Sequence, residues 1–467
     1  MACLLSFEHS TRAETHKLTA VNEMARGIFK QLIEINTTDS VGSVTTAAEA
    51  MAKRFRDAGF DEKDVMVAGP DERKKNLVVR LHGSGKRKPV LFIGHLDVVE
   101  ARREDWTTDP FVFTEKDGFF YGRGTADMKA GDAILVTNFI RLKKEGYVPD
   151  RDLILALTAD EEGGKFNGVE WLMKAHRDWI EAEYCINLDG GEFEKANGKR
   201  LLAAMQASEK VYADFLFESV NAGGHSSEPV RDNAIYHLAG ALSRLQDFNF
   251  SVKVNETTRN FFQRTAEISP SDSAADLQAV AKEPPDEAAA ARLSQAPYFN
   301  TLLRTTCVAT MLSGGHAPNA LPQTARANVN CRIFPGEDPE EVRKTMQRVA
   351  GGPKVTVTMV SQLGADGKAV PVVTVPPSAL LPEVVKAMEK TLSETWPGVP
   401  LVATMSAGAS DGKYTRIAGI PTFGIACMFF ELGDNRAHGK DERTGVQDFY
   451  DGVNFNYKLM RSLSSAN

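Results

Sequence analysis

The sequence predicts an α/β fold in which a mixed, mostly parallel sheet is covered by helices and a smaller α+β sandwich is inserted. Three observations support this fold. Strand-like and helix-like segments alternate up to residue 207, the pattern changes there, and buried-strand character returns near residue 362. A chain of 467 residues is also too long for one hydrophobic core, so we expect at least two domains.

The first part, residues 1–207, contains apolar runs that are typical of strands buried on both faces. These predicted strands cover residues 76–83, 89–99, 152–162 and 184–191. Segments with helical spacing lie between or before them, at residues 45–60, 130–146 and 168–180. Such alternation favours a largely parallel sheet with helices on its faces.

The second part, residues 208–361, has the order strand, helix, strand, strand, helix, strand. The predicted strands are 210–219, 305–315, 324–336 and 354–360, with 305–315 and 324–336 as hairpin partners. The predicted helices are 233–245 and 338–351, and the second opens with Asp-Pro-Glu-Glu, a good helix start. This order predicts an α+β sandwich with one open sheet face. Between its halves, the polar, Ala/Pro-rich residues 252–300 predict a helical, partly mobile insertion.

The third part, residues 362–467, returns to the first pattern. Apolar runs at 401–410 and 420–430 predict buried strands, and residues 380–398 predict a helix. We therefore expect the first domain to be interrupted by the second.

Composition and charge limit the classes of partner. Hydrophobic residues make up 42% of the chain, the net charge is −7, and the pI is about 5.8. An acidic protein is a poor partner for nucleic acid or an anionic membrane, and no apolar run reaches the roughly 18 residues of a membrane span. The N-terminus lacks a basic region before its apolar patch, which predicts a cytoplasmic protein. A periplasmic or secreted protein is the alternative if a natural signal is missing from this sequence.

The cysteines indicate what kind of metal site is possible. There are five, widely spaced and without a C-x-x-C pair: Cys3, Cys185, Cys307, Cys331 and Cys427. This pattern excludes a cysteine zinc site and argues against a disulfide framework. Cys185 and Cys331 are interpreted as small buried hydrophobes. Any metal ligands must then be histidines and carboxylates.

Two polar motifs follow apolar segments. In GHLDVV (94–99), His95 and Asp97 are two residues apart and would face the same way in a strand, so that Asp97 could orient a metal-binding His95. A hydrogen-bonded core pair explains this motif equally well. In YGRGTADMKAG (121–131), Asp127 precedes a helix, where it could be a helix N-cap or a carboxylate that bridges two metals.

Two further strands end in acids. Glu161 and Glu162 lie side by side in LTADEEGG (157–164), and Asp189 lies in INLDGG (186–191). Adjacent buried carboxylates repel one another unless a cation neutralises them, so one could bind metal while the other accepts a proton from water. Imidazole and carboxylates at successive strand ends predict a zinc, cobalt or manganese pair.

In this order and spacing, HLD, GRGTADMKAG, DEEGG, LDGG and NRAHGKDER (435–443) resemble metallopeptidase family twenty. This family includes aminoacylases, glutamate carboxypeptidase, succinyl-diaminopimelate desuccinylase, carnosinase-type dipeptidases and peptidase T. The resemblance covers nearly the whole chain and implies a dizinc exopeptidase catalytic domain with an inserted lid domain. It assigns five ligands for two Zn²⁺ ions, with Co²⁺ or Mn²⁺ as substitutes: His95, Asp127, Glu162, Asp189 and His438.

The resemblance also implies roles within this site. His95, Asp127 and Asp189 would hold one metal, and Asp127 would bridge to the other. Glu161 would be the general base, and Asp97 would support His95. A non-proline cis peptide is expected between Asp127 and Met128.

Lid motifs complete the resemblance. NAGGHSSEP (221–229) implies that His225 reaches the scissile carbonyl oxygen, often from the neighbouring subunit of a homodimer. SGGHAPNALP (313–322) and NCRIFPG (330–336) imply Asn319 and Arg332 as substrate contacts, although Arg332 could instead form a salt bridge within the lid. GASDGKYTR (408–416) implies further contacts from Ser410, Lys413 and Tyr414. The remaining histidines fit no ligand pattern and are interpreted as structural or exposed: His9, His16, His82, His176, His237 and His316.

The substrate is less sharply indicated. Asp189 is typical of di- and aminopeptidases of the family, whereas acylases and carboxypeptidases often have Glu there, although some long-chain N-acyl-amino-acid hydrolases also have Asp. The prediction is therefore an exopeptidase or dipeptidase, with an N-acyl-amino-acid amidohydrolase as the alternative. A non-catalytic binding protein would require the loss of Glu161 or of a ligand, and none is missing.

Overall fold

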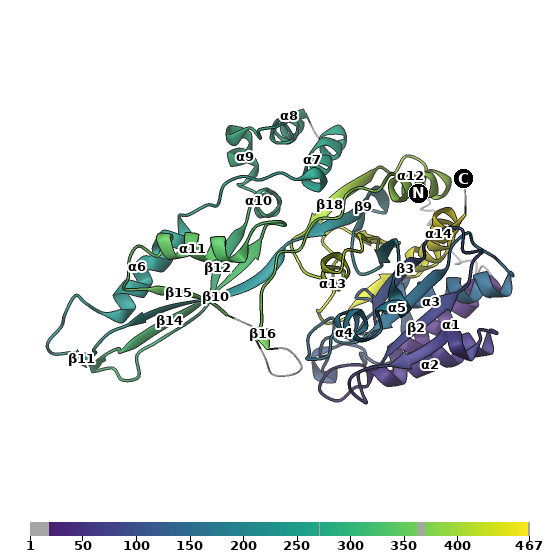
Figure 1. The fold of residues 1–467 in the computed structure, drawn as a ribbon, viewed down its shortest axis with the longest axis horizontal. Helices are drawn as coiled ribbons and strands as arrows, with labels where there is room; N and C mark the ends of the chain where they lie inside the picture. Colours follow the sequence, from purple (N-terminus) through teal and green to yellow (C-terminus); the bar gives the residue numbers. More distant parts are fainter. Residues whose placement is uncertain (1–17, 270, 361, 364–368, 466–467) are drawn as a thin grey trace, which may run out of the picture.

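The computed structural model describes residues 18–269, 271–360, 362–363 and 369–465. Two bodies lie beside each other along the long axis of the molecule (Figure 1). We call the body around a ten-stranded sheet the large unit (residues 18–209 and 380–465), and the body around a four-stranded sheet the small unit (residues 211–250 and 304–360). The predicted fold class, a mixed α/β protein with an inserted α+β part, is confirmed. Cys3, His9, His16 and the N-terminal segment lie outside the described residues.

The sheet of the large unit has the order β1-β2-β6-β3-β7-β19-β9-β8-β20, and β18 pairs with β9. Around its centre, β3 pairs in parallel with both β6 and β7, while β1, β2 and β8 run antiparallel to a neighbour. The strands are β1 (Val65–Ala68), β2 (Asn76–Leu81), β3 (Val90–His95), β6 (Leu153–Thr158), β7 (Tyr184–Asn187), β8 (Phe193–Ala196), β9 (Lys199–Glu209), β18 (Leu401–Ser406), β19 (Thr422–Gly424) and β20 (Phe429–Glu431).

Both faces of this sheet are covered by helices, which explains its continuous apolar strands. On β3, Phe92 faces the core beneath one helical layer, and Leu91 and Ile93 face a second core on the other side. The first layer comprises α1 (Ala20–Glu34), α2 (Val44–Asp57), α3 (Lys129–Lys144), α12 (Pro382–Thr395) and α14 (Val446–Ser464). The second comprises α4 (Gly168–Ala175), α5 (Arg177–Ile180) and α13 (Gly412–Ile417).

The sheet of the small unit has the order β12-β14-β10-β15, and all its pairs are antiparallel. Buried residues alternate with more exposed ones along β10 and β14, because one face packs on helices and the other is open. The predicted hairpin partners do pair. The elements are β10 (Val211–Val220), α6 (Ala234–Gln246), β12 (Thr306–Gly314), β14 (Thr324–Ile333), α11 (Pro339–Val349) and β15 (Thr356–Val360).

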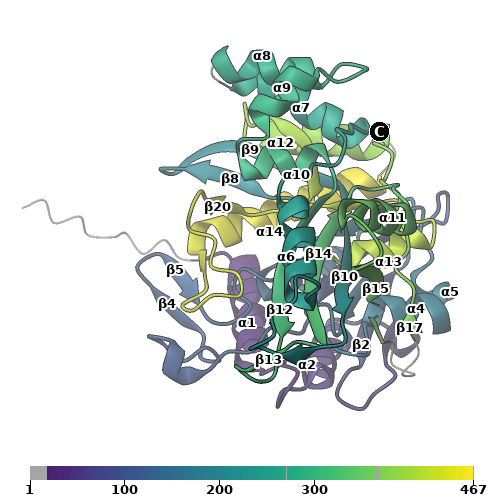
Figure 2. The same cartoon turned by 90° about the vertical axis from the view of Figure 1, so that its left-hand side faces the viewer.

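The predicted insertion is helical, as expected. It comprises α7 (Glu256–Ile268), α8 (Ser271–Val280), α9 (Glu287–Leu293) and α10 (Pro297–Leu303). These helices share a core with Val402 and Met405 of β18, so they pack on the large unit. Figure 1 shows α7 beside β18, with α8 and α9 farther out, and Figure 2 shows the same helices at one end of the molecule.

Short elements complete the chain. They are the 3-10 turns Glu62–Asp64 and Arg103–Asp105, the sheet of β4 (Thr114–Lys116), β5 (Phe119–Tyr121) and β21 (Arg443–Gly445), the pair β11 (Gly224–His225) and β13 (Ala320–Leu321), and the pair β16 (Gln362–Leu363) and β17 (Ala369–Val370). Within the described residues, no helix combines the length and apolar character that crossing a bilayer requires.

The prediction against a disulfide framework is wrong at one place. Cys307 and Cys331 form a disulfide between β12 and β14, where the two residues lie directly opposite each other with Cα atoms 4.1 Å apart. Cys331 is fully buried as expected, but it is not free. Sequence spacing could not show this pairing, because it depends on the register of the hairpin. Cys185 and Cys427 are free and buried.

Three local predictions also need correction. The predicted helix 168–180 breaks at His176, which stacks on Trp179. The predicted strand 420–430 divides into β19 and β20 around Cys427, whose φ is 63°. Strand β3 ends at His95, so Asp97 lies in the following loop, and the alternation of a strand does not set its direction.

The packing of α3 on β3 should dominate the stability of the large unit. Phe139 of α3 and Phe92 of β3 are fully buried, and their rings meet edge to face at 5.9 Å. Phe139→Ala should lower the free energy of unfolding by about 3–5 kcal/mol, because it leaves a cavity beneath the strand. Urea unfolding followed by tryptophan fluorescence measures this, since all four tryptophans belong to the large unit.

The matched control for this experiment is Val148→Ala. Val148 is 69% exposed, so its truncation should change the unfolding free energy by less than about 0.5 kcal/mol. A loss in Phe139→Ala no larger than in this control would contradict the packing argument.

Candidate active site

The predicted ligands gather at one edge of the large sheet. Strand β3 ends at His95, Glu161 and Glu162 follow β6, and Asp189 follows β7. Because β3 is parallel to both β6 and β7, the carboxyl ends of the three strands meet there. The neighbouring loops supply Asp127 and His438.

Two groups of side chains could each hold a metal ion. In the first, His95, Asp127 and Asp189 offer ligand atoms that all lie within 4.8 Å of one another. The second consists of Asp127, Glu162 and His438. Asp127 belongs to both groups, since its Oδ1 lies 3.1 Å from Nε2 of His95 and its Oδ2 lies 3.1 Å from Nε2 of His438. The arrangement therefore matches two cations that share one carboxylate.

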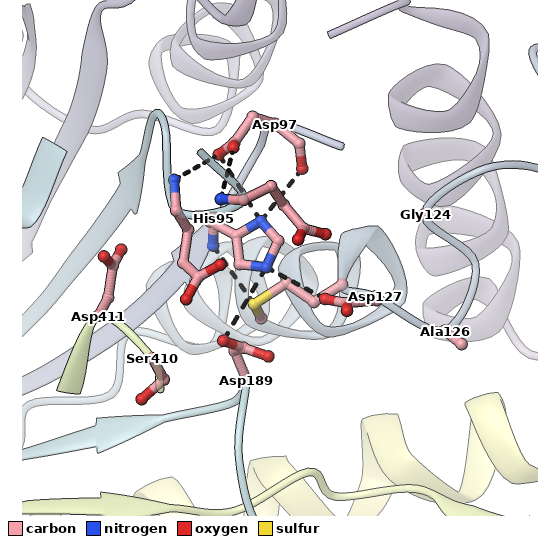
Figure 3. Close-up of polar contacts among 12 residues, drawn as sticks. His95, Asp97, Gly124, Ala126, Asp127, Asp189, Ser410 and Asp411 are labelled. Carbon is pink, nitrogen blue, oxygen red and sulfur yellow. Dashed lines mark hydrogen bonds and ion pairs between the residues drawn. The ribbon is translucent and has the colours of Figure 1, made fainter. Parts of the chain in front are cut away.

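The orientation of His95 is set by its neighbours. Its imidazole lies between Asp97 on one side and Asp127 and Asp189 on the other (Figure 3). Nδ1 of His95 lies 3.1 Å from the main-chain oxygen of Asp97, and Nε2 faces the two other acids. With Nδ1–H donating to that carbonyl, the lone pair of Nε2 is free for a metal.

The Asp97 carboxylate has a wider function than support of His95. Its two oxygens accept hydrogen bonds from the backbone N–H groups of Glu161 and Glu162, at 3.2 and 3.0 Å. Its distance to Nδ1 of His95 is longer, 3.7 Å. Asp97 thus fixes the loop of the two adjacent glutamates at the same time as its main chain fixes the histidine.

The acids of the site perturb one another. Burial raises the pKa of Glu161 to about 8, and burial together with the charge of Asp127 raises that of Glu162 to about 7. Burial and Asp127 also raise the pKa of Asp189 well above its usual range. For Asp127, hydrogen bonds from His438 and His95 outweigh burial and lower the pKa. These carboxylates cannot all be charged together without additional positive charge.

The residues present fit a pair of divalent cations. The donor atoms are imidazole nitrogens and carboxylate oxygens without a thiolate, a set that suits zinc, cobalt or manganese. Positive charge at both groups would remove the repulsion among the buried acids. The Asp127–Met128 peptide is cis, as expected.

Glu442 joins the two loops that carry Asp127 and His438. Its buried carboxylate accepts hydrogen bonds from the backbone N–H groups of Gly124, Ala126 and Asp127 at 2.7–3.1 Å. The same carboxylate pairs with the buried Arg123 at 2.6 Å. His438, four residues earlier, adopts a left-handed φ of 63°, a conformation that is uncommon for residues other than glycine. The motif NRAHGKDER contains Glu442, but nothing in its sequence indicates that this carboxylate binds the backbone before Asp127.

A second polar network lies beneath the site. Asp411 accepts hydrogen bonds from Asn167 at 2.6 Å and from Thr158 at 3.0 Å, and burial raises its pKa to about 6. Ser410, a predicted substrate contact, donates to Glu209 at 2.8 Å and is 7% exposed. Its hydroxyl therefore helps to fix the loop.

The predicted lid residues His225 and Asn319 lie together but away from the metal ligands. His225 on β11 pairs with Ala320 on β13, and the N–H of Ser226 donates to the carbonyl of Asn319. Figure 1 shows β11 at the end of the small unit that lies farthest from the large unit and its strand β3. The imidazole of His225 is exposed, and among the described residues its side-chain partner is the nearby Ser227, at 2.7 Å.

The remaining predicted contacts lie nearer the large unit. The Arg332 guanidinium lies 3.5 Å from the carbonyl of Ala407 and stacks on Tyr212, so its contacts span the two units. Among the described residues it forms no salt bridge within the small unit. Lys413 lies over the ring of Tyr414 on α13. Tyr414 packs against the second core, and burial raises its pKa, with the charges of Asp411, Glu170 and Glu161 adding to the effect.

The fold and the donor set place this chain among the metal-dependent hydrolases. Its residues 91–462 match the model of Peptidase family M20/M25/M40, and the chain belongs to this family. It is 27% identical over 393 residues to "Probable carboxypeptidase S-like 2" of Dictyostelium discoideum, covering 80% of this chain and 72% of that protein.

Two further relatives extend the comparison. The chain is 25% identical over 382 residues to an N-fatty-acyl-amino acid synthase/hydrolase of Homo sapiens, covering 80% of this chain and 74% of that protein. Its fold is similar to the crystal structure of an M20 family metallo-carboxypeptidase from Sulfolobus solfataricus, with a TM-score of 0.68 and 16% identity, covering 94% and 99% of the two chains.

Glu442 provides a test of how the site is held together. Glu442→Gln should leave the buried Arg123 without its charge partner, so the free energy of unfolding should fall by about 3–5 kcal/mol. Bound metal per chain should fall as well, since the loop of Asp127 loses its anchor. Urea unfolding and elemental analysis of the purified protein measure the two effects.

The control is Glu115→Gln, which removes the partner of Arg26 in an exposed pair of 2.9 Å. This substitution should cost less than about 1 kcal/mol and leave the metal content unchanged. Full metal content and stability in Glu442→Gln would remove Glu442 from the site.

Proposed function

We propose that this protein is a dinuclear zinc metallopeptidase that hydrolyses a peptide or amide bond of a small substrate. The observation that carries the proposal is the carboxylate of Asp127, which is shared by two ligand groups beside a glutamate that belongs to neither. No ligand and no base is missing from the set, which disfavours a non-catalytic binding protein.

His95, Asp127 and Asp189 would hold one Zn²⁺, and Asp127, Glu162 and His438 the other. Bound ions supply Lewis acidity and lower the pKa of water at the site. Co²⁺ and Mn²⁺ accept the same donor atoms and are expected to substitute.

Glu161 is the proposed general base. The hydrogen bond from its backbone to Asp97 fixes its position beside the ligands, and it belongs to neither ligand group. It takes a proton from the attacking water and delivers it to the leaving nitrogen. Its burial keeps this transfer away from bulk solvent.

Residues 208–361 are proposed to act as the lid domain and as the contact surface of a homodimer. His225 would donate a hydrogen bond to the scissile carbonyl oxygen, and Asn319 and Arg332 would hold the substrate. His225 lies far from the metal ligands of its own chain, which supports a role in the active site of the partner subunit. An exposed apolar face supports the dimer: Val308, Met311 and Leu312 on the edge strand β12, and Tyr236 on α6.

The disulfide indicates the kind of cellular compartment in which this protein is located. Cytoplasmic localisation was the first expectation, but disulfides such as Cys307–Cys331 persist mainly in oxidising compartments. We therefore propose the alternative, a periplasmic or secreted protein.

Removal of the proposed base gives the first test of this function. In Glu161→Gln, metal content should persist while the rate of hydrolysis falls by roughly 10²- to 10⁴-fold, because proton transfer is lost without loss of a ligand. Elemental analysis and a panel of dipeptides and N-acyl amino acids measure both quantities. Glu62→Gln, at a side chain that is 78% exposed, is the control that should retain activity. Full activity in Glu161→Gln would overturn the assignment.

Metal removal gives a second, independent test. Chelation should abolish hydrolysis, and Zn²⁺, Co²⁺ or Mn²⁺ should restore it with two ions bound per chain. The stoichiometry follows from titration of the apoprotein by calorimetry. A single ion at saturation would contradict the shared role of Asp127.

Mixing of inactive subunits tests whether His225 acts in the partner's site. His225→Ala and Glu161→Gln should each be nearly inactive alone. A dimer that contains one of each has one complete site, so random reassembly should restore about a quarter of the wild-type rate. No recovery in dimers shown to have exchanged subunits would place His225 in its own chain's site or outside catalysis.

A further inference from the structure

A cavity of about 660 Å³ opens beside Asp127 and Asp189. This volume is in the range of small-molecule sites, roughly 300–1,000 Å³. Its walls come from three places: the loops of the metal ligands, the strands β9, β18 and β20, and the inserted helices α7 and α10. Much of the lining is apolar and includes Phe261, Tyr298, Phe299, Val402, Met405 and Phe430.

The inserted helices provide an aromatic wall of this cavity. Phe261 of α7 and Tyr298 of α10 have ring centroids 6.0 Å apart, and Tyr298 and Phe299 lie 5.6 Å apart. The wall is held firmly, because Asn260 accepts the backbone N–H of Ala403 on β18 at 3.1 Å and Phe262 is fully buried in the shared core. The insertion therefore shapes a binding surface next to the proposed metals.

The cavity leaves apolar groups open to solvent. Tyr298 is 56% exposed and Leu432 is 54% exposed, although both border a concave surface. Apolar groups around a concave site gain stability when a ligand covers them. This exposure points to an apolar occupant.

The charges around the cavity exclude an anionic occupant. None of the described residues that line it is basic, whereas Glu192, Glu194 and Glu431 lie at its border. Arg332 is not among the lining residues, and its guanidinium lies 3.5 Å from the carbonyl of Ala407, which borders the cavity. An anionic group of the substrate would therefore be held on the side of Arg332.

We propose that the cavity binds the extended apolar acyl group of an N-acyl amino acid, and that Phe261, Tyr298 and Phe299 determine specificity for long acyl chains. This inference rests on the proposed function and names its substrate class. Water adds to the amide carbonyl, the C–N bond breaks, a fatty carboxylate forms, and the nitrogen leaves with the proton as the amino group of a free amino acid. The carboxylate of that amino acid lies on the side of Arg332.

A different occupant is the free amino terminus of a dipeptide, paired with Glu192 and Glu194. Burial and the charge of Glu192 raise the pKa of Glu194, so these two acids could attract an ammonium. That occupant would leave the aromatic wall uncovered. The apolar character of the wall favours the acyl chain, and the experiment separates the two.

The experiment measures kcat/KM of the zinc-loaded enzyme for N-acyl phenylalanines with acetyl, octanoyl, dodecanoyl and hexadecanoyl groups. The value should rise by up to roughly fourfold per added methylene until the chain fills the cavity. Free-amino dipeptides such as Leu-Phe should be cleaved more slowly than the dodecanoyl substrate.

Two substitutions in the inserted helices test the wall. Thr265→Trp on α7 fills part of the cavity, and Tyr298→Asp places a charge in it. Each should lower the ratio of kcat/KM for dodecanoyl to acetyl substrate by about tenfold or more. Val148→Asp, an exposed position outside the cavity, is the control that should leave this ratio unchanged. Binding of dodecanamide, followed by calorimetry, should weaken in the two cavity variants and not in the control.

The outcomes distinguish the two proposals. Hydrolysis that does not depend on chain length, or a preference for dipeptides that Glu194→Gln abolishes, overturns the acyl assignment while the metal hydrolase stands. No hydrolysis of any substrate by the zinc-loaded enzyme overturns the proposed function itself. Unchanged ratios and unchanged dodecanamide binding in both cavity variants remove the inserted helices from substrate recognition.

Discussion

The shared position of Asp127 between His95 and His438 is the interaction on which the rest of the site depends. Four buried or half-buried acids surround these two imidazoles, and burial alone would force several of them to bind protons. Two cations would resolve this conflict and leave the carboxylates charged. The surrounding structure keeps the acids together against their repulsion: Asp97 holds the backbone of the two adjacent glutamates, and Glu442 holds the backbone before Asp127.

The parallel centre of the large sheet makes this convergence possible. Because β3 lies between β6 and β7, three strands deliver their last residues to one edge. Helices on both faces bury the strands completely, so the site has a rigid base. The small unit lies beyond this edge, and its far end carries His225 and Asn319. A complete site then requires a second chain or a large movement, and the proposed dimer supplies the first.

The inserted helices give the site a character of its own. In the sequence they lie between the two segments of the small unit, but they pack on β18 of the large unit. Their aromatic residues border the cavity beside Asp127 and Asp189 there. Membership of the family explains hydrolysis, and the aromatic wall from the insertion is proposed to select the acyl group of the substrate.

Much of the fold and of the metal site could be predicted from the sequence, because the patterns that indicate them are local. Apolar runs predicted the central strands, and the acids and the histidine after them predicted a pair of metals. The resemblance to the family added His438 and the division into two ligand groups. The roles of Glu442 and Asp411 could not be predicted. Their carboxylates bind groups that are distant in the sequence, and in the sequence they look like any other carboxylate in a polar loop. The disulfide Cys307–Cys331 depends on hairpin register, and the aromatic wall depends on where the insertion packs. Local pattern thus determined the chemistry of the metal site, while long-range packing decided its supports, its disulfide and the shape of its cavity.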